Sequence, residues 1–239
     1  MLTDRSVSII GVTLKGRQQI FQLVAHRKYI FDRMINTSSY SRRKDKRPAE
    51  ILKAALEEFS INGFAGTRLE DVASRAGICK GTIYLYFKNK EELFEEVVRD
   101  RILPYFEQLE DISNQSAGSA ADVLRQQLKI IYRELVSTDT RYIPKLMIGE
   151  GNRFPKLAEF YFNEIITRMH KLLRSVIERG VNAGEFRPEA LAWKPQAILS
   201  PALSAAMWRV VFDQFDPLDV DAVLDTHIDL LMHGLKMRP

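Results

Sequence analysis

The stretch Leu69–Phe94, LEDVASRAGICKGTIYLYFKNKEELF, has the pattern of two short helices joined by a tight turn, with a third helix following at once. Over residues 69–76 the apolar side chains recur at helical spacing, so they share one buried face. Gly77 stands where a helix ends in a left-handed residue, a conformation that glycine adopts without strain. A second short helix is predicted over residues 80–87. This arrangement predicts a helix-turn-helix unit, whose second helix enters the DNA major groove.

The predicted second helix presents hydroxyl and ammonium groups outward, with no acidic residue among them, while Ile83 and Phe87 point inward. Such groups suit phosphate oxygens and base edges. Short helices joined at glycine also occur in helical proteins of other functions, so this surface chemistry is what favours DNA binding. The predicted contacts are to base edges from Lys80, Thr82 and Tyr84, to phosphates from Thr67, Arg68, Tyr86 and Lys90, and a close backbone approach at Gly81.

Residues 51–94 resemble the DNA-binding domain of the tetracycline-repressor (TetR-type) family of transcription regulators. One departure is Cys79, which stands where the family usually carries serine or another good helix cap, so the second helix is predicted to be less well capped. The matching landmarks are Ile51, Ala54, Ala55, Phe59, Gly63, Phe64, Thr67, Ala73, Ala76, Gly77, Gly81, Thr82, Tyr84, Tyr86, Phe87, Lys90, Leu93 and Phe94.

The predicted fold class is all-α, with an N-terminal three-helix helix-turn-helix domain at residues 46–95 joined to a C-terminal helical ligand-binding and dimerisation domain at residues 96–239. A capping box is predicted at Thr67–Glu70, and a polar loop at residues 113–119. No β-rich alternation and no internal repeat is visible. Apolar spacing predicts further helices from residue 48 to a stop at residues 62–63, from residue 89 or 90 across the domain boundary, and over residues 121–136, 142–148, 155–182, 189–215 and 219–236.

Basic residues are concentrated before the helix-turn-helix. Residues 1–47 hold eleven Lys and Arg against three acidic residues, a balance of +8, whereas residues 48–239 hold 24 basic and 28 acidic residues, a balance of −4. We therefore predict a basic, disordered N-terminal extension at residues 1–45, which either runs along DNA or only aids solubility. Residues 1–33 keep no amphipathic period, and Met34 opens an ordinary start for the family, so we expect residues 1–33 to add nothing to the fold.

The resemblance implies a homodimer, in which the last two helices pack against their copies, and a pocket in the body of the second domain. The dimer interface is predicted at Ala202, Ala206, Leu224, Ile228 and Leu231. The pocket residues are predicted to be Phe106, Tyr132, Met147, Phe160, Tyr161, Trp193, Met207 and Trp208, which favour an apolar small-molecule effector. The resemblance thus implies a ligand-responsive transcriptional repressor, which binds a palindromic double-stranded DNA operator in the cytoplasm.

An enzymatic function is not favoured by the sequence. The four histidines never pair at two-histidine metal spacing, and a lone cysteine cannot build a cysteine-rich zinc site, so we predict no metal, no cofactor and no catalytic residue. No apolar run approaches the ~20 residues that a membrane crossing needs. The alternative that stays open is a helical protein without a small-molecule ligand, which binds DNA with little sequence preference or acts through protein contacts.

Overall fold

The computed structural model describes residues 47–115 and 118–236, which are helical apart from turns, loops and an isolated bridge between Phe186 and Lys236. The all-α prediction is therefore confirmed. The basic extension predicted at residues 1–45 lies outside the described residues. From Glu50 onward the described residues form one compact unit, and the contacts below lie within it.

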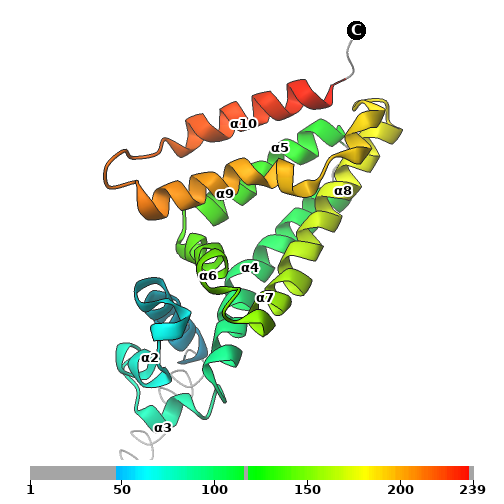
Figure 1. Cartoon of the computed structure of the whole chain (residues 1–239). Coiled ribbons are helices and arrows are strands. Elements are labelled where there is room, and N and C mark those ends of the chain that lie inside the picture. The colour runs from blue at the N-terminus through cyan, green and yellow to red at the C-terminus, as the bar shows by residue number, and fades with distance from the viewer. Residues whose placement is uncertain (1–46, 116–117, 237–239) are drawn as a thin grey trace, which may run out of the picture. The chain divides into compact units, whose positions relative to one another are not determined.

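The domain predicted to bind DNA consists of a first helix over residues 47–66, α2 (Leu69–Arg75), α3 (Lys80–Ile83) and the start of α4 (Lys90–Gln115) (Figure 1). Gly63 interrupts the first helix with a φ of 70°, and Gly77 follows α2 with a φ of 65°. Both angles lie in the left-handed region that glycine occupies without strain. The helix stop predicted at Gly77 is confirmed, whereas the stop predicted at residues 62–63 is wrong, because the helical run continues past Gly63 to residue 66.

Three phenylalanine rings form the centre of this domain. Phe59, Phe64 and Phe94 are fully buried, and their ring centroids lie 5.7, 5.3 and 5.6 Å apart. Two of the three pairs meet edge to face, an arrangement that the aromatic quadrupole favours. Ile83 and Phe87 are buried as predicted. Because Phe94 belongs to α4 and Phe64 follows Gly63, the cluster ties the long fourth helix to the end of the first.

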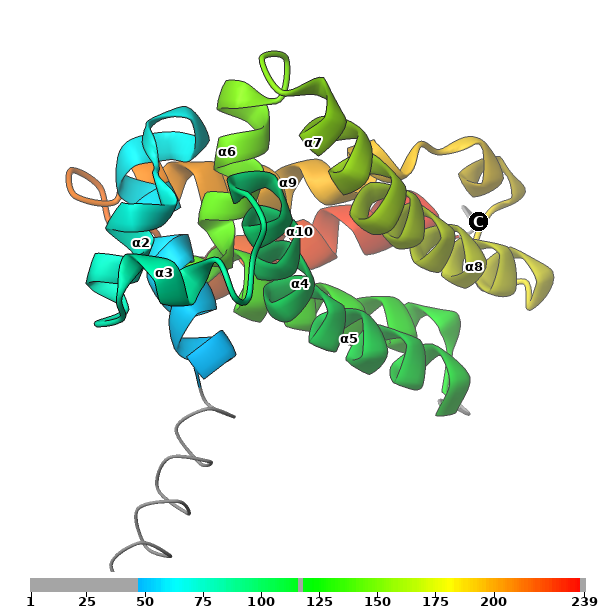
Figure 2. The same ribbon diagram turned by 90° about the horizontal axis from the view of Figure 1, so that it is seen from below.

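The second domain begins along α4, where α5 (Ala120–Ile131) packs beside it (Figure 2). α6 (Tyr142–Glu150), α7 (Pro155–Tyr161) and α8 (Thr167–Asn182) follow, and α8 contacts both α4 and α5. α9 (Pro195–Val211) contacts α6 and α8, and α10 (Val220–Leu235) packs on α9 and α5. The cavity described below lies among these helices.

Several predicted helix boundaries differ from the observed ones. The regular part of α3 ends at Ile83, and hydrogen-bonded turns continue to Phe87. The helical run of α4 reaches Gln115, into the segment predicted as a loop. The helix predicted from residue 189 begins only at Pro195, after a 3-10 turn at Pro188–Ala192. The reason is Pro195 itself, because a proline favours an extended conformation in the residue before it and suits the first helical position.

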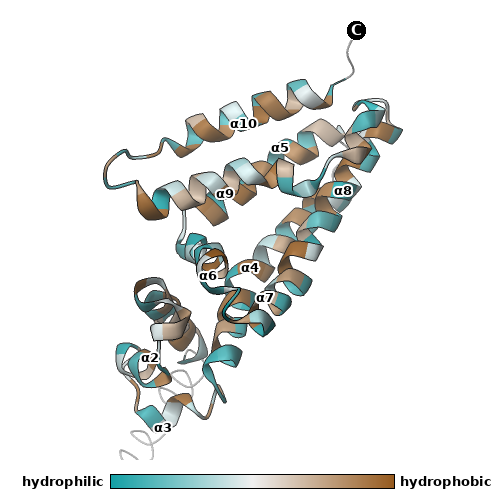
Figure 3. Ribbon diagram, viewed as in Figure 1, coloured by the Kyte–Doolittle hydropathy of each residue, from teal (hydrophilic) through white to brown (hydrophobic). Residues whose placement is uncertain are grey.

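Two predicted helices continue through a π-helical turn. α5 runs into such a turn at Tyr132–Val136, and α7 joins α8 through another at Phe162–Ile166. The runs predicted over residues 121–136 and 155–182 are therefore confirmed as helical. Hydrophobic residues extend along much of α9 and α10 (Figure 3). Over residues 47–115 and 118–236, no helix combines the length and hydropathy needed to cross a membrane.

Candidate nucleic-acid interface and apolar cavity

Glu70 of α2 binds two of the three residues that were predicted to contact base edges, Lys80 and Tyr84. Lys80 Nζ lies 2.8 Å from Glu70 Oε1, and the Tyr84 hydroxyl donates a 3.1 Å hydrogen bond to the same oxygen. The hydrogen bond from Lys80 is the main cause that lowers the pKa of Glu70 to about 2, with smaller effects from the backbone and Tyr84. The helix carrying Lys80 and Tyr84 has no acid of its own, but α2 supplies one.

We expect Glu70→Gln to strengthen DNA binding by about fivefold at low salt, because the carboxylate competes with phosphate for Lys80 and repels it. Fluorescence anisotropy with an operator duplex and a random duplex, at two salt concentrations, measures the effect. Weaker binding in this variant would mean that Glu70 instead positions Lys80 and Tyr84 for base contacts. The depressed pKa also means that the stabilisation by this carboxylate is present above its unfolded pKa and is lost as the pH falls toward 2.

Thr67 lies inside the domain, which corrects two predictions. Its side chain is buried, and Oγ1 donates a 2.7 Å hydrogen bond to the carbonyl of Gly63. The residue at the N-terminal cap of α2 is Arg68, and no side chain caps that helix. The capping box predicted at Thr67–Glu70 is therefore wrong, since Glu70 turns toward Lys80. The phosphate contact predicted for Thr67 is also corrected, because the hydroxyl has no exposed face.

The other predicted DNA contacts stay predictions, and the exposure of these residues is compatible with them. Arg68 and Gly81 are exposed, and Thr82 and Tyr86 are half-buried. A Cβ added at Gly81 would meet no atom within 4 Å, so packing inside the protein does not require glycine there. Cys79 is exposed at the N-terminal cap of α3 and accepts no capping hydrogen bond, as predicted. Among the described residues, no group of His, Cys, Asp and Glu is arranged to hold a metal ion.

Lys90 is tied to the interior rather than free on the surface. Its Nζ donates to the carbonyl oxygens of Phe64 at 2.6 Å and Ala65 at 3.2 Å, and lies 4.6 Å from the Phe64 ring centroid. Burial lowers the pKa of this ammonium. Lys90 therefore holds α4 against the turn after Gly63. The predicted phosphate contact depends on its one remaining N–H.

We expect Lys90→Met to lower the free energy of unfolding by about 1–3 kcal/mol, because two backbone acceptors lose a charged donor. The matched variant Lys88→Met alters an exposed lysine two residues earlier and is expected to leave stability unchanged. Lys88→Met should instead weaken all duplexes similarly and make the salt dependence of binding shallower by about one unit. Urea denaturation and DNA titrations distinguish the two. Equal stability of both variants would contradict this assignment.

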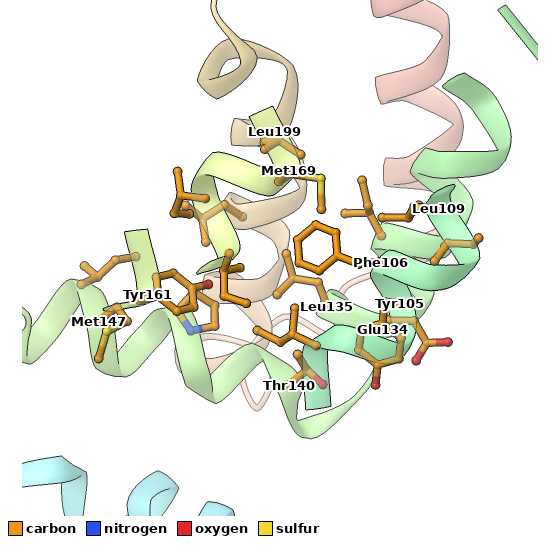
Figure 4. Close-up of a pocket in the computed structure, with 18 residues that line it drawn as sticks. Tyr105, Phe106, Leu109, Glu134, Leu135, Thr140, Met147, Tyr161, Met169 and Leu199 are labelled. Carbon is orange, nitrogen blue, oxygen red and sulfur yellow. The ribbon is translucent and has the colours of Figure 1, made fainter. Parts of the chain in front are cut away.

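The second domain encloses a cavity of about 250 Å³ (Figure 4). Tyr105, Glu134 and Thr140 lie together on one side, Met169 and Leu199 on another, and Tyr161 lies beside Met147 on a third. Burial raises the pKa of both Tyr105 and Tyr161. The walls are formed by Ile102, Tyr105, Phe106, Leu109, Ile130, Ile131, Glu134, Leu135, Thr140, Pro144, Met147, Ile148, Tyr161, Ile165, Ile166, Met169, Leu199 and Leu203.

Three of the predicted pocket residues, Phe106, Met147 and Tyr161, line this cavity. The other five do not, and for them the prediction is corrected. These five side chains pack elsewhere. The Tyr132 hydroxyl lies 3.1 Å from His227 Nδ1 in the core, and the Phe160 ring lies under the Arg99 guanidinium. Trp193 packs against Arg187 and Gly234, the Trp208 indole N–H donates to the Asp216 carbonyl, and Met207 is half-buried outside the cavity.

The side chains that sequence reasoning missed are mostly isoleucine and leucine. They come from α4, α5, α6, the α7–α8 run and α9, and each continues a stripe that also forms ordinary core. Only Glu134 and Thr140 could have indicated a cavity from the sequence, because they are polar residues within or beside an apolar helical pattern. A cavity forms where the apolar faces of several helices leave space between them. The apolar pattern of one helix does not predict where this happens.

The predicted dimer-interface residues lie mostly inside the protomer, which is a correction. Ala202 and Ala206 are completely buried, and Leu224 and Leu231 are nearly so. Ile228 is half-buried against the core. The faces of α9 and α10 that remain exposed are the opposite ones. Their small or apolar residues, together with two in the turn after α9, are Ala197, Ser200, Ser204, Val211, Phe212, Phe215, Ala222, Thr226 and Leu230.

α6 contacts both the cavity and the helix-turn-helix domain. The carboxylate of Glu150, its last residue, accepts hydrogen bonds from the backbone N–H groups of Phe64 at 2.7 Å and Ala65 at 2.8 Å. Lys145 Nζ donates to the Ser60 carbonyl at 3.3 Å. The Phe154 ring, just beyond α6, lies edge-on to Phe64 with centroids 4.7 Å apart. The same helix contributes Pro144, Met147 and Ile148 to the cavity wall.

Two family models match the chain. The model of bacterial regulatory proteins of the tetR family matches residues 51–97, and the model of the C-terminal domain of AefR-like transcriptional repressors matches residues 122–233. The first match covers the helix-turn-helix, and the second covers most of the domain that contains the cavity. The chain belongs to the TetR family of transcription regulators. The predicted resemblance is thus confirmed, and the family's proteins are regulators rather than enzymes.

Individual relatives extend the likeness over both domains. The fatty acid metabolism regulator protein of Bacillus subtilis is 25% identical over 201 residues, which are 80% of this chain and 98% of that protein. The HTH-type transcriptional repressor KstR2 of Mycolicibacterium smegmatis is 28% identical over 142 residues, or 59% of this chain and 67% of that protein. A crystal structure of the regulator FadR from Bacillus subtilis in complex with stearoyl-CoA superposes with a TM-score of 0.65 at 26% identity, covering 78% of this chain and 98% of that one.

Proposed function

We propose that this TetR-family regulator is a ligand-responsive repressor, which binds a palindromic operator as a homodimer in the bacterial cytoplasm. The observation that carries the proposal is the double role of α6. Met147 and Ile148 face the cavity, while Glu150 bonds the backbone of Phe64 and Ala65 in the DNA-binding domain. A ligand that favours a different position of α6 would therefore bias the helix-turn-helix as well.

The proposed effector is a mostly apolar molecule with a hydrocarbon portion that fills the cavity. Aliphatic and aromatic side chains form nearly all of the walls, and none of the described lysine, arginine or histidine residues lines them. A ligand of this kind gains affinity by removing apolar surface from water. The stearoyl-CoA held by the FadR structure and the fatty acid metabolism regulator among the relatives support a long acyl chain as the occupant.

The proposed dimer uses the exposed faces of α9 and α10. Val211, Phe212, Phe215 and Leu230 are large hydrophobic residues with 49, 47, 77 and 68% of their surface exposed. Small residues beside them allow two helix pairs to approach closely. A two-fold dimer would present two copies of α3 to half-sites about 34 Å apart, and a ligand that changes this separation would release the operator.

We expect Leu135→Trp to abolish the response to apolar effectors, because the indole would occupy the middle of the cavity (Figure 4). Phe162→Trp is the control, since Phe162 is exposed on the adjoining helical run. The experiment measures operator release by a panel of long-chain alcohols, acids and thioesters, with excess random duplex as competitor. If no compound changes operator affinity in the wild type, the second domain has no effector role. Loss of the operator to random competitor would instead support a sequence-tolerant DNA binder.

A further inference from the structure

Three polar side chains of the cavity wall, Tyr105, Glu134 and Thr140, lie together on one side of the apolar cavity (Figure 4). We call these three residues the polar cluster. Thr140 is buried, and the side chain of Glu134 keeps only 16% of its surface exposed. Because the other wall residues are apolar, the polar cluster determines which polar group a ligand in the cavity can carry.

The backbone around the polar cluster holds two of its members in place. Glu134 lies in the π-helical turn Tyr132–Val136 that follows α5, and such turns are frequent at functional sites. The Thr138 hydroxyl donates a 2.5 Å hydrogen bond to the Glu134 carbonyl and lies 2.9 Å from the Thr140 hydroxyl. Thr138 therefore ties the turn that carries Glu134 to the segment that carries Thr140.

Tyr105, the third member, belongs to α4. Burial is the main cause that raises the pKa of its phenol, while hydrogen bonding with Thr140 lowers this pKa and hydrogen bonding with Glu134 raises it. The phenol thus stays protonated at neutral pH and lies within reach of both partners. It can donate a hydrogen bond to a ligand oxygen at the place where Glu134 can accept one.

The charge of Glu134 is already balanced by a neighbour outside the cavity. Its Oε1 accepts a 2.5 Å hydrogen bond from Arg133 Nε, and the Arg133 side chain is 58% exposed. A carboxylate can accept about four hydrogen bonds, so Glu134 keeps acceptor capacity for a ligand. A cationic ligand group would gain less here than at an unpaired carboxylate, whereas a neutral donor needs only the free acceptor.

An anionic ligand group would meet no cation on the cavity wall. None of the described lysine, arginine or histidine residues lines it. Arg101, one turn before Tyr105 on α4, lies 3.5 Å from Asp100 in an ion pair and is not a wall residue. Burying an unpaired anion beside a carboxylate is strongly unfavourable. The polar cluster therefore suits a neutral group that both donates and accepts.

We propose that the polar cluster selects an effector that carries an uncharged hydroxyl group on its hydrocarbon portion. The ligand hydroxyl donates to Glu134 and accepts from Tyr105, so both hydrogen-bonding roles of the group are satisfied. This inference rests on the proposed function, because it requires a hydrocarbon in the cavity. It adds the chemistry of the polar group that the cavity recognises.

The test compares four ten-carbon probes by isothermal titration: 1-decanol, 2-decanone, decanoate and decylamine. All four have a similar apolar tail. The polar group of 1-decanol both donates and accepts, that of 2-decanone only accepts, and the other two are an anion and a cation. We expect 1-decanol to bind the wild type about tenfold tighter than each of the other three compounds.

Two variants test the residues that carry the proposal. Glu134→Gln is expected to remove most of the advantage of 1-decanol over 2-decanone, because the new amide N–H can donate to the ketone. Tyr105→Phe should weaken both compounds by about fivefold, since it removes the donor that either oxygen would use. Glu107→Gln alters an exposed acid of α4 and is the control, which should leave all four affinities unchanged.

The outcomes separate this inference from the proposed function. Equal affinity of 1-decanol and 2-decanone for the wild type, or an advantage of 1-decanol that survives in Glu134→Gln, overturns the polar cluster as a hydroxyl site while the cavity still binds an apolar tail. Tighter binding of decanoate or decylamine than of 1-decanol overturns it in the same way. If none of the four compounds binds, the cavity has no apolar ligand and the proposed function fails as well.

Discussion

Leu230→Glu is expected to convert the proposed dimer into monomers and to weaken operator binding by about 100-fold or more, with the recognition residues untouched. Leu230 is 68% exposed on α10, so a glutamate there meets solvent in the isolated protomer and leaves its core intact. In a two-fold interface the same charge would be buried twice, once in each copy. Light scattering measures the mass, and titration of an operator duplex measures the affinity.

The control is Phe162→Glu, which places the same charge on an exposed aromatic position away from α9 and α10. It should remain dimeric and keep its operator affinity. Ile228→Glu is a poorer test, because Ile228 is half-buried against the protomer core and a charge there disturbs the monomer itself. A folded Leu230→Glu protein that still runs as a dimer would place the interface elsewhere.

The features that could be predicted from the sequence depend on neighbours close along the chain. Gly63 and Gly77 have positive φ where helix stops were predicted, and Ile83 and Phe87 are buried as their spacing indicated. Helical periodicity predicts which residues share a face, and glycine indicates where the chain can adopt a positive φ and turn. These local rules were sufficient for the fold class and for the helix-turn-helix.

The roles of Lys90 and Glu70 could not be predicted in the same way. Lys90 binds carbonyls 25 and 26 residues away, and Glu70 reaches Tyr84 across the turn between two helices. Both side chains are long and flexible, so their partners depend on how the helices pack. A basic residue after a recognition helix suits phosphate by its chemistry, yet its neighbours in space determine whether the charge is free.

The dimer residues show a different limit. α9 has small residues on two faces, with Ala202 and Ala206 inward and Ser200 and Ser204 outward. Periodicity separates the faces but does not say which one packs inside the protomer, because alanine and serine suit either environment. The cavity could not be predicted for the same reason, because its wall residues belong to apolar helix faces that elsewhere form the core.

Glu150→Ala is expected to weaken the link between the cavity and the operator while leaving the cavity intact. The substitution removes the acceptor for the Phe64 and Ala65 N–H groups, and Glu150 lies at the end of α6, beyond the wall residues Met147 and Ile148. Hydrogen exchange at these two amides should accelerate, and the free energy of unfolding of the DNA-binding domain should fall by about 2 kcal/mol.

The coupling itself is measured with a probe, which is a compound from the panel of long-chain alcohols, acids and thioesters that releases the operator from the wild type. In the wild type the probe is expected to weaken operator binding by about tenfold, and in Glu150→Ala by much less, although its affinity for the free protein stays the same. Glu159→Ala removes an exposed acid of α7 and should behave as the wild type. Full release of the operator by the probe in Glu150→Ala would show that α4, which also runs from the cavity wall into the DNA-binding domain, transmits the signal without α6.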